Sequence, residues 1–361
     1  MYKPTVLVTG SAGHLGKALM LALPDLGYHP IGIDIKPSST TTLIGSITDT
    51  TFLDFVFATY QPVHIIHAAT LHKPHICSHT KHEFIQPTSP ARTPSSSRHR
   101  PLPPALPLPP NVHAIPATNP TVKSFIFIST TSTFGHALAP PPGEPAAWID
   151  ESVVPQPKNI YGVTKTAAED VCRLAHKQTG LPILVLRMSR FFPEEDDDEE
   201  RRGAMGGDNL KVLELASRRV DLADAVAACV CAMDKAGRGE GKVGWGTYIV
   251  SGPTPFKRED GVLRGLDEDA GRVFETVCPG VGEVFERKGW RFLRRVDRVY
   301  DSGRAVRELG WKPVYTFQRA VEMVGKGEEW RSELSLWVGK LGYHAVSTGV
   351  YTTREDNMEA R

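Results

Sequence analysis

A glycine-rich turn near the amino terminus constrains the fold of this chain more than any other feature. Residues 5–9 form a short apolar run rich in β-branched side chains, and Gly10, Gly13 and Gly16 follow it. Residues 15–26 then carry Leu, Ala and Met at helical spacing. In such a strand–turn–helix unit, the glycines permit a tight turn, a close approach of backbone to a pyrophosphate, and close packing of helix on strand. The amino terminus of the helix then faces the phosphates of a dinucleotide.

An acidic residue at the end of the next strand indicates which dinucleotide would bind. Residues 29–33 are apolar and end at Asp34, which completes a strand–helix–strand unit of a parallel sheet. A carboxylate here accepts hydrogen bonds from the adenosine ribose hydroxyls and repels a 2′-phosphate. Asp34 therefore favours NAD as the cofactor, with NADP as the alternative because Lys36 lies close by.

Further apolar runs predict an α/β fold with a Rossmann-type doubly wound parallel sheet. Residues 63–67, 124–128 and 182–186 are candidates for buried strands, and residues 161–178 have the composition of a helix. From about residue 192 the pattern changes to shorter elements and glycine turns, which predicts a smaller carboxy-terminal α/β substrate lobe. We expect a Rossmann domain at residues 1–190, a substrate lobe at 191–345 with Rossmann elements interleaved, and a tail at 346–361.

Residues 87–120 depart from this plan. They are rich in proline and serine and include the run PLPPALPLPP at residues 101–110, a composition that cannot be helical. A doubly wound sheet needs a crossover helix between the strands predicted at residues 63–67 and 124–128. The sequence shows none there.

Two groups of polar residues point to redox chemistry. Tyr161 and Lys165 are four residues apart, about one helical turn, so the phenol and the ammonium share one face. A nearby cation, with an oxidised nicotinamide, lowers the pKa of a phenol towards neutrality and makes it a usable general base.

The hydroxyl-rich segment 129–135 follows an apolar strand. Ligands of open parallel sheets bind beyond the carboxyl ends of the strands, so these hydroxyls can reach a substrate oxygen.

Charge and cysteine content argue against several kinds of partner. The 361 residues include 42 Lys+Arg and 41 Asp+Glu, a formal net charge of +1. This net charge provides no electrostatic attraction for nucleic acid or anionic lipid. No apolar run approaches the roughly 20 residues of a membrane span. Five scattered cysteines indicate reduced thiols in a cytoplasmic protein.

Two clusters of potential metal ligands are expected to have other roles. The acidic run at residues 194–200 predicts a solvated loop because consecutive carboxylates repel one another. His64, His67, His72 and His75 favour structural or cofactor-adjacent roles because their spacing alternates across a strand and into a loop. We expect no metal.

Together these features resemble the NAD-dependent epimerase/dehydratase family, the extended short-chain dehydrogenases/reductases, of which UDP-glucose 4-epimerase is a well-known member. The resemblance extends over nearly the whole chain apart from residues 87–120. It is carried by the glycine turn, Asp34, HAAT at residues 67–70, the hydroxyl loop ending in Gly135, Tyr161, Lys165, LR at residues 186–187, RVDLAD at residues 219–224, and Asp301 followed by LGWKP at residues 309–313.

The resemblance implies an NAD-dependent epimerase or dehydrogenase acting on a sugar, most naturally a nucleotide-linked one. Thr130, five residues before Gly135, would be the catalytic hydroxyl, Tyr161 the proton acceptor, and Lys165 the residue that holds the ribose and lowers the pKa of Tyr161. The implied cofactor contacts are Gly10, Gly13, His14, Leu15, Gly16, Asp34, Ser46, Ile47, Ala68, Ala69, Tyr161 and Lys165. The implied substrate contacts are Thr131, Ser132, Ser189, Arg190, Asn209 and Leu210. A homodimer is usual in this family.

Several departures from the family keep other functions open. Dehydratases carry an Asp-Glu pair after the catalytic Thr, whereas this chain has Thr131 and Ser132, which argues against dehydration. Ser46 replaces an adenine-contacting Asp, and residues 188–190 replace the Phe-Asn of epimerases. The alternatives are a non-catalytic NAD-binding regulatory protein of the same fold and a reductase of small carbonyl compounds or alcohols.

The proline-rich segment suggests an error of reading frame. Residues 86–92 can be encoded as CAA-CCA-ACG-TCA-CCG-GCA-CG, and the same bases read one nucleotide earlier give Thr-Asn-Val-Thr-Gly-Thr. Those residues open the crossover helix of the family and include its active-site Asn. Our hypothesis is that residues 87 to about 117 are translated out of frame, and the alternative is a genuine disordered loop.

Overall fold

The computed structural model describes residues 3–71, 121–135, 140–191, 205 and 207–341. Several features discussed above lie outside the described residues: the segment 87–120, His72, His75, the acidic run 194–200 and the tail 346–361.

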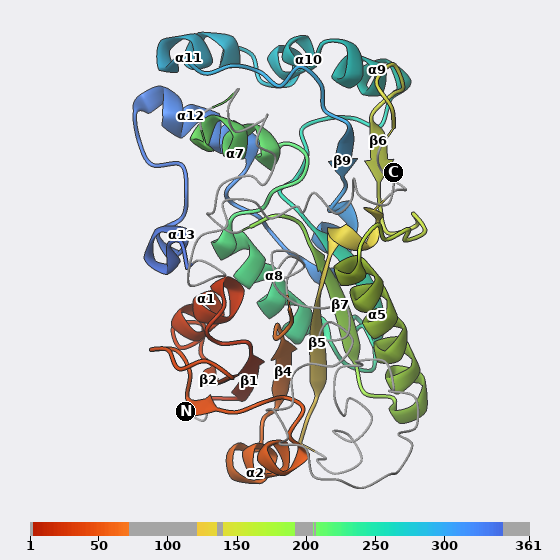
Figure 1. The fold of residues 1–361 in the computed structure, drawn as a ribbon, viewed down its shortest axis with the longest axis vertical. Coiled ribbons are helices and arrows are strands. Elements are labelled where there is room, and N and C mark those ends of the chain that lie inside the picture. Colours follow the sequence, from red (N-terminus) through yellow and green to blue (C-terminus); the bar gives the residue numbers. More distant parts are fainter. Residues whose placement is uncertain (1–2, 72–120, 136–139, 192–204, 206, 342–361) are drawn as a thin grey trace, which may run out of the picture.

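The central element is a parallel sheet of seven strands in the order β3-β2-β1-β4-β5-β7-β8. Figure 1 labels β2, β1, β4, β5 and β7 of this sheet. The strands are β1 (Thr5–Thr9), β2 (His29–Asp34), β3 (Leu43–Ile44), β4 (His64–His67), β5 (Ser124–Thr130), β7 (Ile183–Met188) and β8 (Trp245–Val250). The direction of winding reverses between β1 and β4, and ligands of such sheets bind beyond the carboxyl ends of the strands at this switch point. The predicted Rossmann-type fold is confirmed.

Alternate residues of each strand enter separate cores on the two faces of the sheet. Val6 and Val8 of β1 belong to one core, which is covered by α1 (His14–Ala22) and α8 (Leu222–Lys235). Leu7 belongs to the opposite core, which is covered by α2 (Thr50–Tyr60) and α5 (Ile160–Thr179). A continuous apolar strand is therefore buried on both faces, as parallel sheets require.

Element boundaries differ from the predicted ones where a local residue ends a helix. The first helix ends at Ala22 rather than continuing to residue 26, because Pro24 has no amide hydrogen to donate to the preceding turn. Helix α5 ends at Thr179, where Gly180 takes the left-handed conformation at φ 67°.

The smaller lobe is mainly helical and lies above the carboxyl ends of the sheet strands in Figure 1. It contains α7 (Gly207–Leu215), α9 (Asp260–Glu268), α10 (Ala270–Val277), α11 (Val281–Lys288) and α12 (Phe317–Lys326). Its aromatic core includes Phe256, Phe274, Phe285 and Phe317. A two-stranded parallel sheet joins β6 (Ala147–Ile149) to β9 (Arg298–Tyr300), so the chain enters this lobe before residue 190.

Two short elements connect the lobe to the large sheet. The π-helical segment η4 (Ala305–Leu309) contributes Ala305 and Leu309 to the core that α1 and α8 cover. Helix α13 (Glu333–Val338) packs against α1 and α8, and the Lys17 ammonium of α1 donates a hydrogen bond to the Val338 carbonyl at 3.2 Å. The carboxy-terminal part of the described chain is therefore attached to the helix that follows the glycine turn.

Candidate active site

The glycine turn has the close backbone packing that its sequence predicts. Gly10 has φ 75°, and a Cβ at this position would lie 2.8 Å from the Ala69 amide nitrogen at the end of β4. A Cβ on Gly16 would lie 2.0 Å from the Gly10 carbonyl oxygen. The amide of Gly13 donates to the same carbonyl at 3.1 Å. Any side chain at residue 10 or residue 16 would therefore force the turn open.

Asp34 holds the turn from the end of β2. Its Oδ2 accepts a hydrogen bond from the Ala12 amide at 3.0 Å, and its Oδ1 accepts one from the Lys36 amide at 2.9 Å. Each carboxylate oxygen has a second lone pair with which to accept a ribose hydroxyl. Asp34 therefore shapes the glycine turn as well as being a candidate ribose acceptor.

The other predicted cofactor contacts have structural partners in this fold. The Ser46 hydroxyl lies 2.8 Å from that of Thr48 and accepts the Thr48 amide at 3.2 Å, while Ile47 packs against the core beneath α2. His14 is buried, and its Nε2 accepts the Leu341 amide at 3.3 Å. Leu15 is buried in the core between α1 and the sheet.

The end of β4 is fixed to β1 through Thr9. The Ala68 amide donates to the Thr9 carbonyl at 3.2 Å, and the Ala69 amide donates to the Thr9 hydroxyl at 3.1 Å. The same hydroxyl lies 3.0 Å from Nδ1 of His67. Burial lowers the pKa of His67 to about 3, with a smaller effect from Lys165, so this imidazole is neutral at physiological pH. The backbone on which the cofactor is expected to lie is thus held by buried hydrogen bonds.

Thr130 and Tyr161 come together at the carboxyl end of β5. Thr130 is the last residue of β5, and its hydroxyl accepts the Ser132 amide at 3.1 Å. Burial raises the pKa of Tyr161 to about 12, and its side-chain hydrogen bond with Thr130 acts in the opposite direction. The predicted catalytic pair is therefore in contact, but the surrounding protein raises the phenol pKa, so a shift towards neutrality stays a prediction for the cofactor-bound protein.

Lys165 lies one turn further along the same face of α5. Its Nζ donates a hydrogen bond to the Ile128 carbonyl at 2.7 Å and lies 4.8 Å from the centroid of the Phe127 ring. Burial lowers the pKa of Lys165 to about 8, and the nearby Glu169 carboxylate opposes this effect. The ammonium is thus held against β5, close to the end of the strand that carries Thr130.

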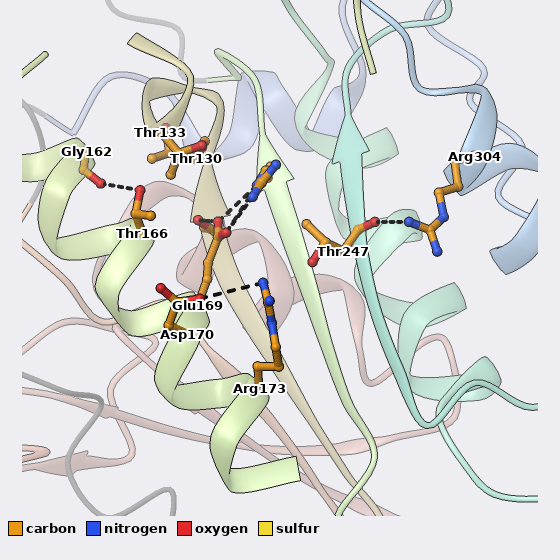
Figure 2. Close-up of polar contacts among 11 residues, drawn as sticks. Thr130, Thr133, Gly162, Thr166, Glu169, Asp170, Arg173, Thr247 and Arg304 are labelled. Atoms are coloured by element: carbon orange, nitrogen blue, oxygen red, sulfur yellow. Dashed lines mark hydrogen bonds and ion pairs between the residues drawn. The ribbon is translucent and has the colours of Figure 1, made fainter. Parts of the chain in front are cut away.

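The sequence analysis missed Glu169, which forms a buried polar network with Ser129 and Arg187. The Ser129 hydroxyl donates to Oε1 of Glu169 at 2.5 Å, and Arg187 donates to both carboxylate oxygens, with Nη2 at 2.7 Å from Oε2. Figure 2 shows Glu169 with these dashed contacts and the neighbouring Asp170 paired separately with Arg173. Glu169 stands eight residues after Tyr161, a spacing that could have placed it on the catalytic face of α5.

The predicted substrate residues fall into two groups. Thr131 is buried in the 3-10 helix η2 (Thr131–Thr133), and Ser132 lies beside it at the end of β5. Ser189 follows β7, and its buried hydroxyl has no hydrogen-bond partner among the described residues. These three residues lie at the carboxyl edge of the sheet, where a substrate is expected.

The remaining three predicted substrate residues have partners inside the protein. Nη1 of Arg190 pairs with the buried Glu214 carboxylate at 3.0 Å, which Arg218 and Arg219 also contact. The Asn209 amide donates to the Arg291 carbonyl at 3.0 Å and accepts the Arg291 amide at 2.9 Å. Leu210 lies in the aromatic core of the small lobe. Asn209 therefore connects two segments of the lobe, which its position in the sequence did not reveal.

The profile of the NAD dependent epimerase/dehydratase family matches residues 6–91 and 111–243, more than half of the chain. The chain belongs to this family. The match includes the glycine turn, Asp34, Thr130, Tyr161 and Lys165, so the predicted family is confirmed. Residues 92–110, inside the proline-rich segment, are left out of the match.

The curated relatives share only about a quarter of their aligned residues with this chain. The chain is 26% identical to dTDP-glucose 4,6-dehydratase of Salmonella typhimurium over 252 residues, which are 66% of this chain and 64% of that protein. It is 28% identical to UDP-glucose 4-epimerase of Rhizobium leguminosarum bv. trifolii over 190 residues, which are 51% of this chain and 50% of that protein. The chain therefore spans about half to two thirds of the length of these relatives.

Solved structures show the same fold. The UDP-glucose 4-epimerase of Thermotoga maritima with UDP-glucose superposes with a TM-score of 0.56 and 18% identity, covering 89% of this chain and 97% of that chain.

Among the helices of the described residues, none is long and apolar enough to cross a membrane. In the same part of the chain, no three His, Cys, Asp or Glu side chains are grouped so that they could hold a metal ion.

Proposed function

We propose that this chain binds NAD and catalyses an NAD-dependent epimerisation or dehydrogenation of a nucleotide-linked sugar. The observation that carries the proposal is the contact between Thr130 and Tyr161, with Lys165 one turn away, at the sheet edge that also carries the glycine turn. Membership of the family supports the coarse activity, and the names of the relatives support the substrate class.

The residues at the glycine turn fit a bound NAD. Gly10 and Gly16 let the turn pack against β4 and against itself, because a Cβ at either position would meet backbone atoms. A Cβ on Gly13 would meet only the Gly10 carbonyl oxygen, at 3.4 Å, so a pyrophosphate can approach the backbone there and at the amino terminus of α1. The free lone pairs of Asp34 can accept the ribose hydroxyls and would repel the additional phosphate of NADP. When bound, NAD supplies a group that accepts a hydride and can return it.

The proton step belongs to Tyr161. Its phenolate oxygen would take the proton of a substrate hydroxyl while the hydrogen on the same carbon leaves as hydride, accepted by a bound NAD, so that the alcohol becomes a ketone. The Thr130 hydroxyl hydrogen-bonds the same substrate oxygen, because it already lies beside the phenol. The positive charge of Lys165 favours the phenolate, and the bound nicotinamide adds to this effect. An epimerase then returns the hydride to the opposite face of the ketone, whereas a dehydrogenase releases the ketone.

The residues after Thr130 argue against dehydration even though four curated relatives are named dTDP-glucose 4,6-dehydratase. Elimination of water needs an acid and a base of its own at the neighbouring carbon. The adjacent positions here are Thr131 and Ser132, whose hydroxyls are poor acids and bases near neutral pH. We therefore place epimerisation or dehydrogenation first.

The test begins with the purified chain. Denaturation should release NAD, and the folded protein should convert UDP-galactose to UDP-glucose or reduce NAD with that sugar. Tyr161→Phe should lower kcat by about 10²–10⁴-fold, whereas Tyr60→Phe at the end of α2 should not. Turnover that survives Tyr161→Phe would exclude the mechanism. Bound NAD without turnover, on sugars or on a panel of alcohols and carbonyl compounds, would instead favour a non-catalytic NAD-binding protein.

A further inference from the structure

The contacts of the proposed catalytic side chains fix the position of α5 along the strand β5. Tyr161 contacts Thr130 at the end of the strand, and Lys165 donates to the carbonyl of Ile128, two residues earlier. Residues four apart on a helix lie about 6 Å apart along its axis. A movement of α5 along β5 by more than a hydrogen-bond length would therefore break both contacts.

Glu169 makes the third contact of the same face, and it joins three elements. It lies one turn beyond Lys165 and accepts the Ser129 hydroxyl from β5 and the Arg187 guanidinium from β7. Ser129 and Arg187 are register partners in adjacent parallel strands, so their side chains leave the sheet on the same face. The carboxylate thus fits between two neighbouring positions of the sheet.

This network leaves little freedom of movement. The side chains of Glu169 and Arg187 are only 5% and 7% exposed, and the pair is bidentate, the geometry in which a guanidinium and a carboxylate orient each other most strongly. The Arg187 guanidinium also lies 4.9 Å from the centroid of the buried Phe134 ring. A shift of α5 along β5 would separate charges that water cannot reach.

We infer that Glu169 is a positioning residue for Tyr161 and Lys165: it fixes α5 against β5 and β7 and balances the charge of the buried ammonium. The inference rests on the proposed proton-transfer role of Tyr161. Glu169 itself need not touch substrate or cofactor for this purpose.

The charges around Lys165 agree with this role. On α5, Glu169 raises the pKa of Lys165 against the effect of burial, and Cys172 keeps its proton because burial raises its pKa. From β4, His67 is neutral, because burial and the charge of Lys165 both lower its pKa, so it adds no charge near the ammonium. From β7, the charge of Arg187 is already paired with Glu169. Removing the Glu169 carboxylate should therefore make the Lys165 ammonium lose its proton more readily.

The experiment follows the Nζ resonance of Lys165 by NMR in the full chain, labelled with ¹⁵N-lysine and saturated with NAD. The resonance is assigned by its loss in Lys165→Arg. We expect Glu169→Gln to lower its titration midpoint by about one pH unit. The control is Asp170→Asn, which removes the adjacent carboxylate, 67% exposed and paired only loosely with Arg173 at 3.6 Å, and should leave the midpoint unchanged.

A second variant covers the case in which Glu169→Gln does not fold. Glu169→Gln/Arg187→Met removes both buried charges and leaves none unpaired, so it should fold and still lower the Lys165 midpoint. In the folded variant, kcat with UDP-galactose should fall at least about tenfold while KM and the NAD dissociation constant change little. A midpoint equal to that of the unaltered chain in the folded variant would overturn the inference. So would a joint loss of NAD binding and kcat with no change of midpoint.

The titration needs no substrate, so it can be separated from the proposed function. Full activity of Tyr161→Phe would overturn the proposed proton transfer and leave the titration result standing. Activity lost in Tyr161→Phe, together with an unchanged midpoint and kcat in Glu169→Gln, would overturn only the positioning role.

Discussion

Replacement of Gly16 by alanine tests the geometry of the dinucleotide turn directly. The new Cβ would lie 2.0 Å from the Gly10 carbonyl oxygen, whereas ordinary van der Waals contact begins at 3.4 Å. The neighbouring atom is backbone, so the turn has to open by about 1.4 Å rather than rotate a side chain away. Overpacking of this kind costs about 1–3 kcal/mol of folding free energy. It also moves the amides of the turn away from the position that a pyrophosphate needs.

Gly261→Ala is the matched control. Gly261 lies in α9, has no left-handed φ, and a Cβ there would meet nothing within 4 Å. Alanine in a helix is favoured over glycine by about 0.5–1 kcal/mol, so this variant should be slightly more stable than the unaltered chain. Urea unfolding should separate the two variants by about 1.5–4 kcal/mol, and only Gly16→Ala should lose the NAD released on denaturation. The reasoning is wrong if Gly16→Ala keeps both its NAD and its stability.

Four other predictions follow from the site. The pKa of His67 is about 3 in the folded chain and about 6.5 when unfolded, so its neutral form contributes stability above pH 6.5 that is lost towards pH 3. In urea, the free energy of unfolding of the unaltered chain should fall by about 2 kcal/mol between pH 7 and pH 5, and that of His67→Phe should not. An equal fall in both proteins would exclude His67 as the cause. Arg187→Met should cost about 3–5 kcal/mol because it leaves the Glu169 carboxylate buried and unpaired, and a cost no larger than that of Glu169→Gln/Arg187→Met would contradict this. Asp34→Asn should weaken NAD binding, measured by calorimetry, while reducing discrimination against NADP, and unchanged selectivity would refute its role. The nucleotide sequence behind residues 87–117 should contain codons that give the crossover helix when read one nucleotide earlier, and incompatible codons would end the reading-frame hypothesis.

Much of the fold was predictable because the relevant signals are local. The apolar runs at residues 5–9, 124–128 and 182–186 became β1, β5 and β7, since parallel strands buried on both faces need continuous apolar sequence. The strands β3, β6 and β9 went unpredicted because they are only two or three residues long. The six-residue strand β8 was not predicted either. Helix ends were placed less accurately than the helices themselves, as with α1 at Pro24.

The site was predictable in part. The spacing of Tyr161 and Lys165 put them on one face of a helix, and Thr130 lies at the end of a strand that the apolar run at residues 124–128 predicted. The pKa of Tyr161 was not predictable, because burial opposes the expected shift and burial depends on everything packed around α5. Asn209 and Arg190 were expected at the substrate, but their partners Arg291 and Glu214 are distant in sequence.

The sequence by itself predicted the glycine turn, Asp34 at the end of the next strand, and Tyr161 and Lys165 as the proposed proton-transfer residues, because each is recognised from a short pattern on one strand, turn or helix. Only the tertiary structure decided how α5 is fixed against the sheet. Glu169, Ser129 and Arg187 come from three elements, and their buried network exists because the register of β5 and β7 brings two of them together beneath the third.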